Sequence, residues 1–252
     1  MPWGMNGDKP VPADYDGDGI GDIAVWRAND GVWYILPSNS PGTYTATPWG
    51  LGGDIPLPGD YDGDGRADIA VWRPTEGVWY ILPSGSPGTY LSTQWGMASD
   101  IAVPGDYDGD SITDLAVWRP DSTVWYVLLS GSPGSYTSTQ WGLSGDKPVP
   151  ADYDGDGQTD IAIWRPDSTV WYILLSGSQG NYSATQWGLS TDTPAVGDYD
   201  ADGIADIGVF RPETGVWYAL KSSIPGAYTA IQWGLSGDVP ISALTSIVRQ
   251  LP

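Results

Sequence analysis

One acidic segment recurs along this chain at a fixed interval. Its first copy, DYDGDGIGD, occupies residues 14–22, and its leading aspartate returns at positions 60, 106, 152 and 198, each 46 residues after the last. Such a period constrains the fold more strongly than the chain length does, because every unit must form the same structure and bury its apolar surface against its neighbours. We therefore expect residues 1–252 to form one repeat array and not several independent domains.

The period divides the chain into five units and a tail. The units span approximately residues 8–53, 54–99, 100–145, 146–191 and 192–237, and a diverged C-terminal tail covers 238–252. The tail has the composition of a strand but no acidic loop, so it either closes the array or pairs with another molecule.

Each unit reads as four short β-segments. In the second unit these are residues 55–60, 69–73, 78–82 and 89–95, separated by Gly, Pro, Ser and Asp clusters and without a helical period. Two segments are almost wholly apolar, so both faces of the sheet must be covered. Five such units predict an all-β fold, a five-bladed β-propeller of four-stranded antiparallel blades. A β-roll needs repeats of about nine residues, and a β-sandwich would not repeat so regularly.

The acidic loops have the spacing of oxygen ligands for calcium. Four carboxylates at alternate positions repel one another unless a cation lies between them. Positions 1, 3 and 5 offer side-chain oxygens, position 7 a backbone carbonyl, and position 9 closes the cage directly or through water. An EF-hand is excluded because position 12 is Val25, within an expected strand. A solvated Asp-Gly turn is the alternative for a single copy, but five intact copies favour about five structural Ca²⁺ ions, one per repeat. The predicted ligands are Asp14, Asp16, Asp18, Ile20, Asp22, Asp60, Asp62, Asp64, Arg66, Asp68, Asp106, Asp108, Asp110, Ile112, Asp114, Asp152, Asp154, Asp156, Gln158, Asp160, Asp198, Asp200, Asp202, Ile204 and Asp206.

The five loops are not equivalent. Ser111 stands where the other four loops have glycine, at a position that often needs a positive φ. The third site is therefore expected to be the most strained or weakest. Ala201 replaces the preceding glycine of the fifth loop, which we interpret as a milder change.

The charge of the chain is concentrated in these loops. The formal net charge is −21, and the loops hold 20 of the 31 acidic residues, so five divalent ions would bring the total to −11. No run of Lys or Arg offers the basic surface that nucleic acid requires. The chain has no cysteine, which excludes disulfides and thiolate metal sites.

The cellular location of the protein is inferred from the predicted calcium sites. Calcium loops fill readily where calcium is abundant, so we expect a secreted or cell-surface protein, with no apolar stretch long enough for membrane insertion and no signal peptide in the sequence given. Residues 1–5 align with residues 47–51, so the chain begins midway through a repeat. Either a leader has been removed, or the chain was trimmed or designed around its repeats.

These motifs resemble a known family. Residues 59–61 (GDY), the following DGDG and residues 68–71 (DIAV) are similar to the strand, calcium loop and second strand of FG-GAP or VCBS-type repeats, the blades of integrin-like β-propellers. The resemblance extends from about residue 8 to 238. Residues 72–74 (WRP) stand where the family often has Gly-Ala-Pro, as in the bacterial, Trp-rich form. The resemblance implies an extracellular role in adhesion or binding, and a related fungal lectin binds sugars with this architecture.

Two further repeat classes have structural and ligand-binding interpretations. The 15 Trp and 15 Tyr residues could stack on sugar rings, but packing between blades is the stronger interpretation. The arginine class (Arg27, Arg73, Arg119, Arg165 and Arg211) and the aspartate class (Asp8, Asp54, Asp100, Asp146, Asp192 and Asp238) are expected on the rim opposite the acidic loops. We predict that they form ion pairs between blades, with ligand binding there as the alternative.

The residue inventory argues against an enzyme. There is no His or Cys, and the only glutamates are Glu76 and Glu213, so no base is available to activate a serine. We predict a non-enzymatic, calcium-stabilised binding or adhesion module with an unidentified protein or glycan ligand. The alternatives are a carbohydrate-binding lectin and a self-assembling scaffold, natural or designed, that associates through the tail.

Overall fold

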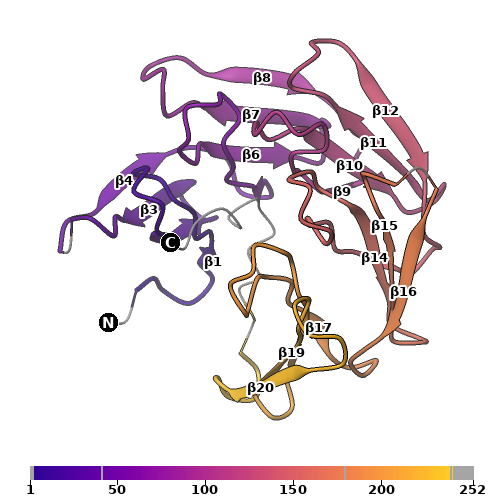
Figure 1. Cartoon of the computed structure of the whole chain (residues 1–252). Coiled ribbons are helices and arrows are strands. Elements are labelled where there is room, and N and C mark those ends of the chain that lie inside the picture. Colours follow the sequence, from indigo (N-terminus) through magenta and orange to yellow (C-terminus); the bar gives the residue numbers. More distant parts are fainter. Residues whose placement is uncertain (1–2, 41, 179, 239, 241–252) are drawn as a thin grey trace.

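The fold is built entirely from short β-strands. The computed structural model describes residues 3–40, 42–178, 180–238 and 240, and the regular elements in this part of the chain form five sheets of four antiparallel strands. Strands keep chain order within each sheet, so every sheet is an up-and-down meander. Figure 1 shows the sheets following one another in an arc around a common centre. The predicted five-bladed β-propeller is confirmed.

The strand bounds repeat from blade to blade. The first blade contains β1 (Lys9–Pro10), β2 (Ile23–Arg27), β3 (Val32–Leu36) and β4 (Thr45–Pro48), and the second contains β5 (Ile55–Pro56), β6 (Ile69–Arg73), β7 (Val78–Leu82) and β8 (Leu91–Gln94). The third contains β9 (Ile101–Ala102), β10 (Leu115–Arg119), β11 (Val124–Leu128) and β12 (Tyr136–Gln140). The fourth contains β13 (Lys147–Pro148), β14 (Ile161–Arg165), β15 (Val170–Leu174) and β16 (Tyr182–Gln186). The fifth contains β17 (Thr193–Pro194), β18 (Ile207–Arg211), β19 (Val216–Leu220) and β20 (Tyr228–Gln232).

The innermost strands are shorter than expected. Residues 55–60 are predicted to be extended, but only Ile55–Pro56 forms a regular strand, although the Leu57 N–H beyond it still donates to the Ala70 carbonyl of β6 (2.9 Å). Pairing resumes as an isolated bridge between Gly59 and Asp68. This bridge closes the base of the acidic loop, so the loop is held between the first two strands of its blade.

Aromatic pairs fill the space between consecutive blades. Trp164 and Trp171 are fully buried and belong to one cluster with Val196 and Val209 of the next blade. Phe210 takes the place of tryptophan in the fifth blade and is also buried. The interpretation that aromatic residues pack between blades is therefore confirmed for the repeat positions of Trp164 and Trp171. Burial of such large side chains is the main stabilising contribution to a blade interface.

In the described part of the chain, the arc leaves a gap between the first and fifth blades (Figure 1). Among the described residues, no hydrogen bond joins the β1–β4 sheet to the β17–β20 sheet. Trp233, which leaves the fifth blade, is 76% exposed. Residues 239 and 241–252 lie outside the described part of the chain, so the closing or swapped-strand role of the tail stays a prediction, as do the unit boundaries.

Candidate metal centres

The first aspartate of each loop organises its own backbone. Asp60 accepts hydrogen bonds at Oδ1 from the Gly63 N–H (2.7 Å) and at Oδ2 from the Gly65 N–H (2.8 Å). Both glycines have positive φ, 77° and 84°, which lets the chain curl around the carboxylate. Asp14, Asp106, Asp152 and Asp198 make the same pair of bonds. The Asp-Gly sequence therefore dictates a concave loop.

The loops bring three carboxylates together in each repeat. One oxygen from each member lies within 4.8 Å of the others in five clusters: Asp14, Asp16 and Asp18; Asp60, Asp62 and Asp68; Asp106, Asp108 and Asp114; Asp152, Asp154 and Asp160; Asp198, Asp200 and Asp206. The last four clusters join positions 1, 3 and 9, whereas the first joins positions 1, 3 and 5. Each cluster could hold a metal ion.

Position 5 accepts a hydrogen bond from a serine hydroxyl in all five loops, including the first, where the donor is Ser38. Asp64, for example, accepts a hydrogen bond from the hydroxyl of Ser84 (2.8 Å), which lies in the loop that follows β7. The predicted ligands at position 7, such as Arg66, would contribute only their backbone carbonyl groups. Among the described residues, these five carbonyl oxygens accept no hydrogen bond in the turns and loops. They remain free to bind a cation.

Position 9 has a structural role that the sequence pattern did not reveal. Asp68 is fully buried and accepts hydrogen bonds from the Tyr61 N–H (2.8 Å) and the Ser84 N–H (2.7 Å). It therefore ties the acidic loop to the loop that follows β7. Burial raises the pKa of Asp68, and likewise that of Asp160, to about 6. Burial also raises the pKa values of Asp22 and Asp114.

Two carboxylate oxygens show that the clusters fit a cation. Oδ1 of Asp108 and Oδ1 of Asp200 are buried and have no hydrogen-bond partner among the described residues. A buried anionic oxygen without a partner is strongly unfavourable. Both belong to position 3 of their loops. Hard oxygen donors at this spacing suit Ca²⁺, which accepts six to eight of them.

Two loops carry side chains in the left-handed region. Ser111 has φ 69°, where its glycine counterparts have 83° to 87°, so the expected strain in the third loop is present. Ala201 has φ 62°, where its counterparts have 77° to 81°. The interpretation of Ala201 as a milder change is therefore wrong, because both residues occupy the same unfavourable backbone region.

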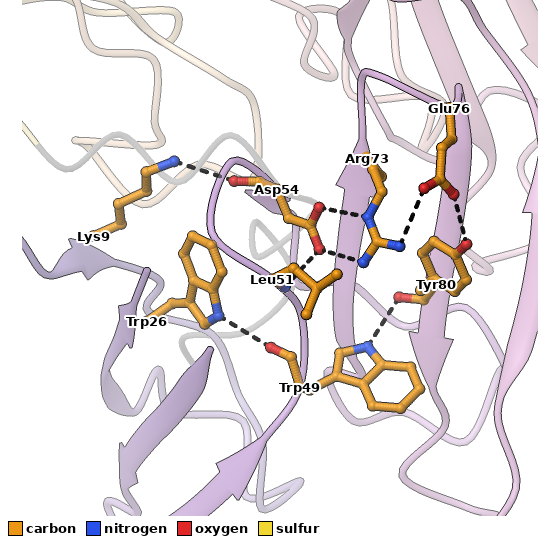
Figure 2. Close-up of polar contacts among 8 residues, drawn as sticks. All are labelled: Lys9, Trp26, Trp49, Leu51, Asp54, Arg73, Glu76 and Tyr80. Carbon is orange, nitrogen blue, oxygen red and sulfur yellow. Dashed lines mark hydrogen bonds and ion pairs between the residues drawn. The ribbon is translucent and has the colours of Figure 1, made fainter. Parts of the chain in front are cut away.

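The opposite rim carries the Arg–Asp pairs. Arg73 donates from Nε to Asp54 Oδ1 (2.8 Å) and from Nη2 to Oδ2 (3.0 Å), and Oδ2 also accepts from the Leu51 N–H (Figure 2). The same two-point contact joins Arg27 to Asp8, Arg119 to Asp100, Arg165 to Asp146 and Arg211 to Asp192.

These pairs correct one prediction. The ion pairs were expected to link neighbouring blades. Each instead joins the connection that precedes a blade to the second strand of that same blade. The reason is register: β5 and β6 are antiparallel neighbours, which places Asp54 beside Arg73 at the same end of the sheet. Asp238, the sixth member, forms no ion pair with another described residue; its Oδ2 accepts the Leu235 N–H.

An aromatic groove lies between consecutive blades on this side. Trp49 donates from Nε1 to the Tyr80 carbonyl of the next blade (3.1 Å) and lies 5.7 Å from the Tyr90 ring, while Arg73 stacks on Tyr80. Between the fourth and fifth blades the groove encloses about 470 Å³. Its lining includes Thr169, Gln186, Trp187, Arg211, Tyr218 and Tyr228.

Known proteins give a consistent picture of the fold. The FG-GAP-like repeat family model matches residues 14–71, 60–117, 106–163 and 152–209. No curated protein sequence matches the chain.

In the part of the chain that the structure describes, no helix is long and apolar enough to cross a membrane.

Three solved structures are similar over most of the chain. A lectin from Agrocybe aegerita, described as recognising non-reducing terminal N-acetylglucosamine, is 15% identical, with 90% of this chain and 81% of the lectin covered and a TM-score of 0.58. Virginiamycin B lyase from Staphylococcus aureus is 6% identical, with 92% and 72% covered and a TM-score of 0.60. BBS1N, solved with ARL6DN, is 12% identical, with 89% and 66% covered and a TM-score of 0.51. At these identities the likeness extends to the fold alone.

Proposed function

The chain belongs to the FG-GAP-like repeat family, and from this we propose that it is a calcium-stabilised, non-enzymatic binding and adhesion module that works outside the cell. The observation that carries the proposal is the buried, unpartnered carboxylate oxygen found in two of the five clusters. A cation at each cluster would compensate these oxygens. Because calcium is abundant outside cells, the same chemistry supports a secreted or cell-surface location.

Calcium would act by joining parts of a blade. The cluster residues come from both ends of the acidic loop, and Asp68 also contacts the loop after β7. An ion bound there would hold three segments at once, and its binding free energy would add to the stability of the folded state.

The residue types do not favour catalysis. The chain has neither His nor Cys, and the perturbed carboxyl groups recur in equivalent loops, as expected for a structural role and not for a single active site. The likeness to a lyase concerns the fold, so it supplies no catalytic residue.

Thermal unfolding and metal counting test the proposal. Protein stripped with chelator is titrated with calcium, and bound ions are counted per chain. We expect about five ions and a Tm that rises with calcium concentration. Asp108→Asn should bind one ion fewer, whereas Asp121→Asn, an exposed acid outside the loops, should bind the full number. A Tm independent of calcium would refute the proposal.

The aromatic grooves favour carbohydrate binding as a second candidate. The groove between the fourth and fifth blades combines flat aromatic faces with Arg, Gln and hydroxyl groups, which suit the apolar faces and the hydroxyls of a sugar ring. The groove tyrosines are accessible: Tyr44, Tyr90, Tyr136, Tyr182 and Tyr228 are 58% to 61% exposed. The similar lectin adds weight to this candidate.

Glycan-array binding separates the two candidates. Replacing the five exposed groove tyrosines with Ala should abolish sugar binding while leaving calcium binding intact. The matched control replaces an exposed apolar residue in each connection: Leu51, Met97, Leu143, Leu189 and Leu235. Loss of binding in the control, or retention in the tyrosine variant, would count against a sugar site in the grooves.

A further inference from the structure

Neighbouring acidic loops are bonded to each other along the rim. The Asp60 carbonyl oxygen accepts a hydrogen bond from the Thr113 N–H of the next loop (2.6 Å). The donor is always position 8 and the acceptor always position 1 of the preceding loop. The equivalent bonds join Ala67 to Asp14 (2.7 Å), Thr159 to Asp106 (2.6 Å) and Ala205 to Asp152 (2.8 Å). The five loops therefore form one continuous row.

Side-chain packing reinforces these bonds. A Cβ atom built on Gly63 would lie 3.0 Å from Cδ1 of Ile112, the position 7 residue of the next loop. A Cβ atom built in the same way on Gly17, Gly109 or Gly155 would lie 3.0 to 3.1 Å from the position 7 side chain of the next loop. These side chains are Arg66, Gln158 and Ile204, respectively. Position 4 is therefore glycine wherever another loop follows. The fifth loop has Ala201 at this position, and within the described residues no further acidic loop packs against it.

The acceptor of each contact is a proposed ligand, and the donor lies between two proposed ligands of the next site. Asp60 both shapes its own loop and accepts the bond from Thr113, while Thr113 lies between Ile112 and Asp114, two proposed ligands of the next site. An ion that fixes Asp114 and the Ile112 carbonyl would also fix the Thr113 N–H. This N–H in turn orients the Asp60 peptide in the preceding loop.

We propose that calcium binds cooperatively along this rim, with each loop coupled to the next through the bond from position 8 to position 1. This inference rests on the proposed calcium sites. The first ion orders backbone that its neighbour also needs, so the second ion meets a smaller entropic cost and binds more tightly. The coupling is reciprocal between neighbours, because it is a difference of binding free energies.

The row has two ends. Within the described residues, the Gly21 N–H, at position 8 of the first loop, donates to no other loop, and the Asp198 carbonyl accepts from none. This agrees with the opening between the first and fifth blades (Figure 1). The coupling is therefore linear, and Gly21 offers a matched control at a position that makes no coupling bond.

The test compares Ala67→Pro with Gly21→Pro. Proline deletes the N–H at position 8 in both variants, and neither residue has a positive φ in the structure. Calcium binding is measured by calorimetric titration of chelator-stripped protein, with the ions counted per chain. We expect the wild type and Gly21→Pro to share the same ion count and the same steep isotherm. Ala67→Pro should keep the ion count but lose steepness, with one site weakened about five-fold or more.

Further variants keep the outcome decisive. Ala67→Gly retains the N–H and should bind like the wild type. If Ala67→Pro does not fold, Ala205→Pro makes the same cut between the fourth and fifth loops. Equal isotherms for the coupled and control proline variants would overturn the cooperativity while leaving the calcium sites standing. A wild type that binds no calcium would instead overturn the proposed function itself, and this inference with it.

Discussion

The aspartates on the two rims of the propeller differ in how their negative charge is compensated. On one rim, each of five connection aspartates is buried against an arginine from the same repeat, with the shorter contact at 2.8 to 2.9 Å. On the other rim, no basic side chain in the described residues forms an ion pair with any loop aspartate. One rim therefore compensates its charge within the chain, whereas the described residues supply no such compensation on the other. The difference lies in the composition of each rim, since both carry buried carboxylates.

Calcium removal should separate the rims most clearly. With calcium at about 100 times its Kd, each bound ion contributes about 2.7 kcal/mol to its site. Chelation should therefore accelerate amide hydrogen exchange about 100-fold at loop amides such as Gly63 and Gly65. The Leu51 amide, which donates to Asp54 on the opposite rim, should change little. Equal acceleration on both rims would show that calcium supports the whole fold and not the acidic rim in particular.

The ion pairs of the arginine rim can be tested by a substitution outside the acidic loops. Asp54→Ala removes both hydrogen bonds to Arg73 and the bond from the Leu51 N–H, and should cost about 2 kcal/mol, lowering the Tm by about 4–8 °C. Asp238→Ala is the matched control, because Asp238 caps the same turn and has no arginine contact among the described residues. Its effect should stay within about 0.5 kcal/mol. Similar losses in thermal unfolding of the two variants would show that the turn, and not the ion pair, matters.

Much of this comparison could be predicted from the sequence. The strands at residues 69–73 and 78–82 were predicted with the bounds they have, because apolar runs between Gly-rich turns leave little ambiguity. The acidic loops were predicted because their pattern is local. The partners of Asp68 and the bond between Asp60 and Thr113 were not, because they depend on how loops far apart in the chain meet in space. The error over the Arg–Asp pairs has the same origin, since the spacing does not reveal strand register.

The rims should also respond oppositely to pH. Without calcium, burial raises the pKa of Asp68 and Asp160 to about 6 in the folded protein, above about 3.9 in an unfolded chain. The folded state then holds more protons between these values, so this contribution to stability is complete below about pH 4 and is lost as pH rises through about 6. Each group changes stability by at most about 1.4 kcal/mol per pH unit.

Asp8 on the arginine rim has the other sign. Hydrogen bonding to Arg27 lowers the pKa of Asp8, so its contribution is present above the unfolded value and is lost as pH falls through the lowered folded value. Urea unfolding of chelated protein between pH 4.5 and 7.5, within about the window set by the raised pKa values, should show stability falling as pH rises. Adding calcium should abolish or reverse that slope, because a bound cation favours the ionised carboxylates. A chelated protein that gains stability with pH would contradict the raised pKa values.

The smallest expected effect concerns backbone strain, which both rims carry. Ser111 (φ 69°) lies in the third acidic loop and Thr123 (φ 55°) in the turn between β10 and β11 on the arginine rim. Replacing either with glycine should relieve about 1 kcal/mol, or about 2–4 °C in Tm. Only Ser111→Gly should also tighten calcium binding, because only that strain lies within a ligand loop. If Thr123→Gly shifts the calcium isotherm as much as Ser111→Gly does, the two rims are energetically coupled through the strands, and the acidic rim is not the independent unit that its contacts describe.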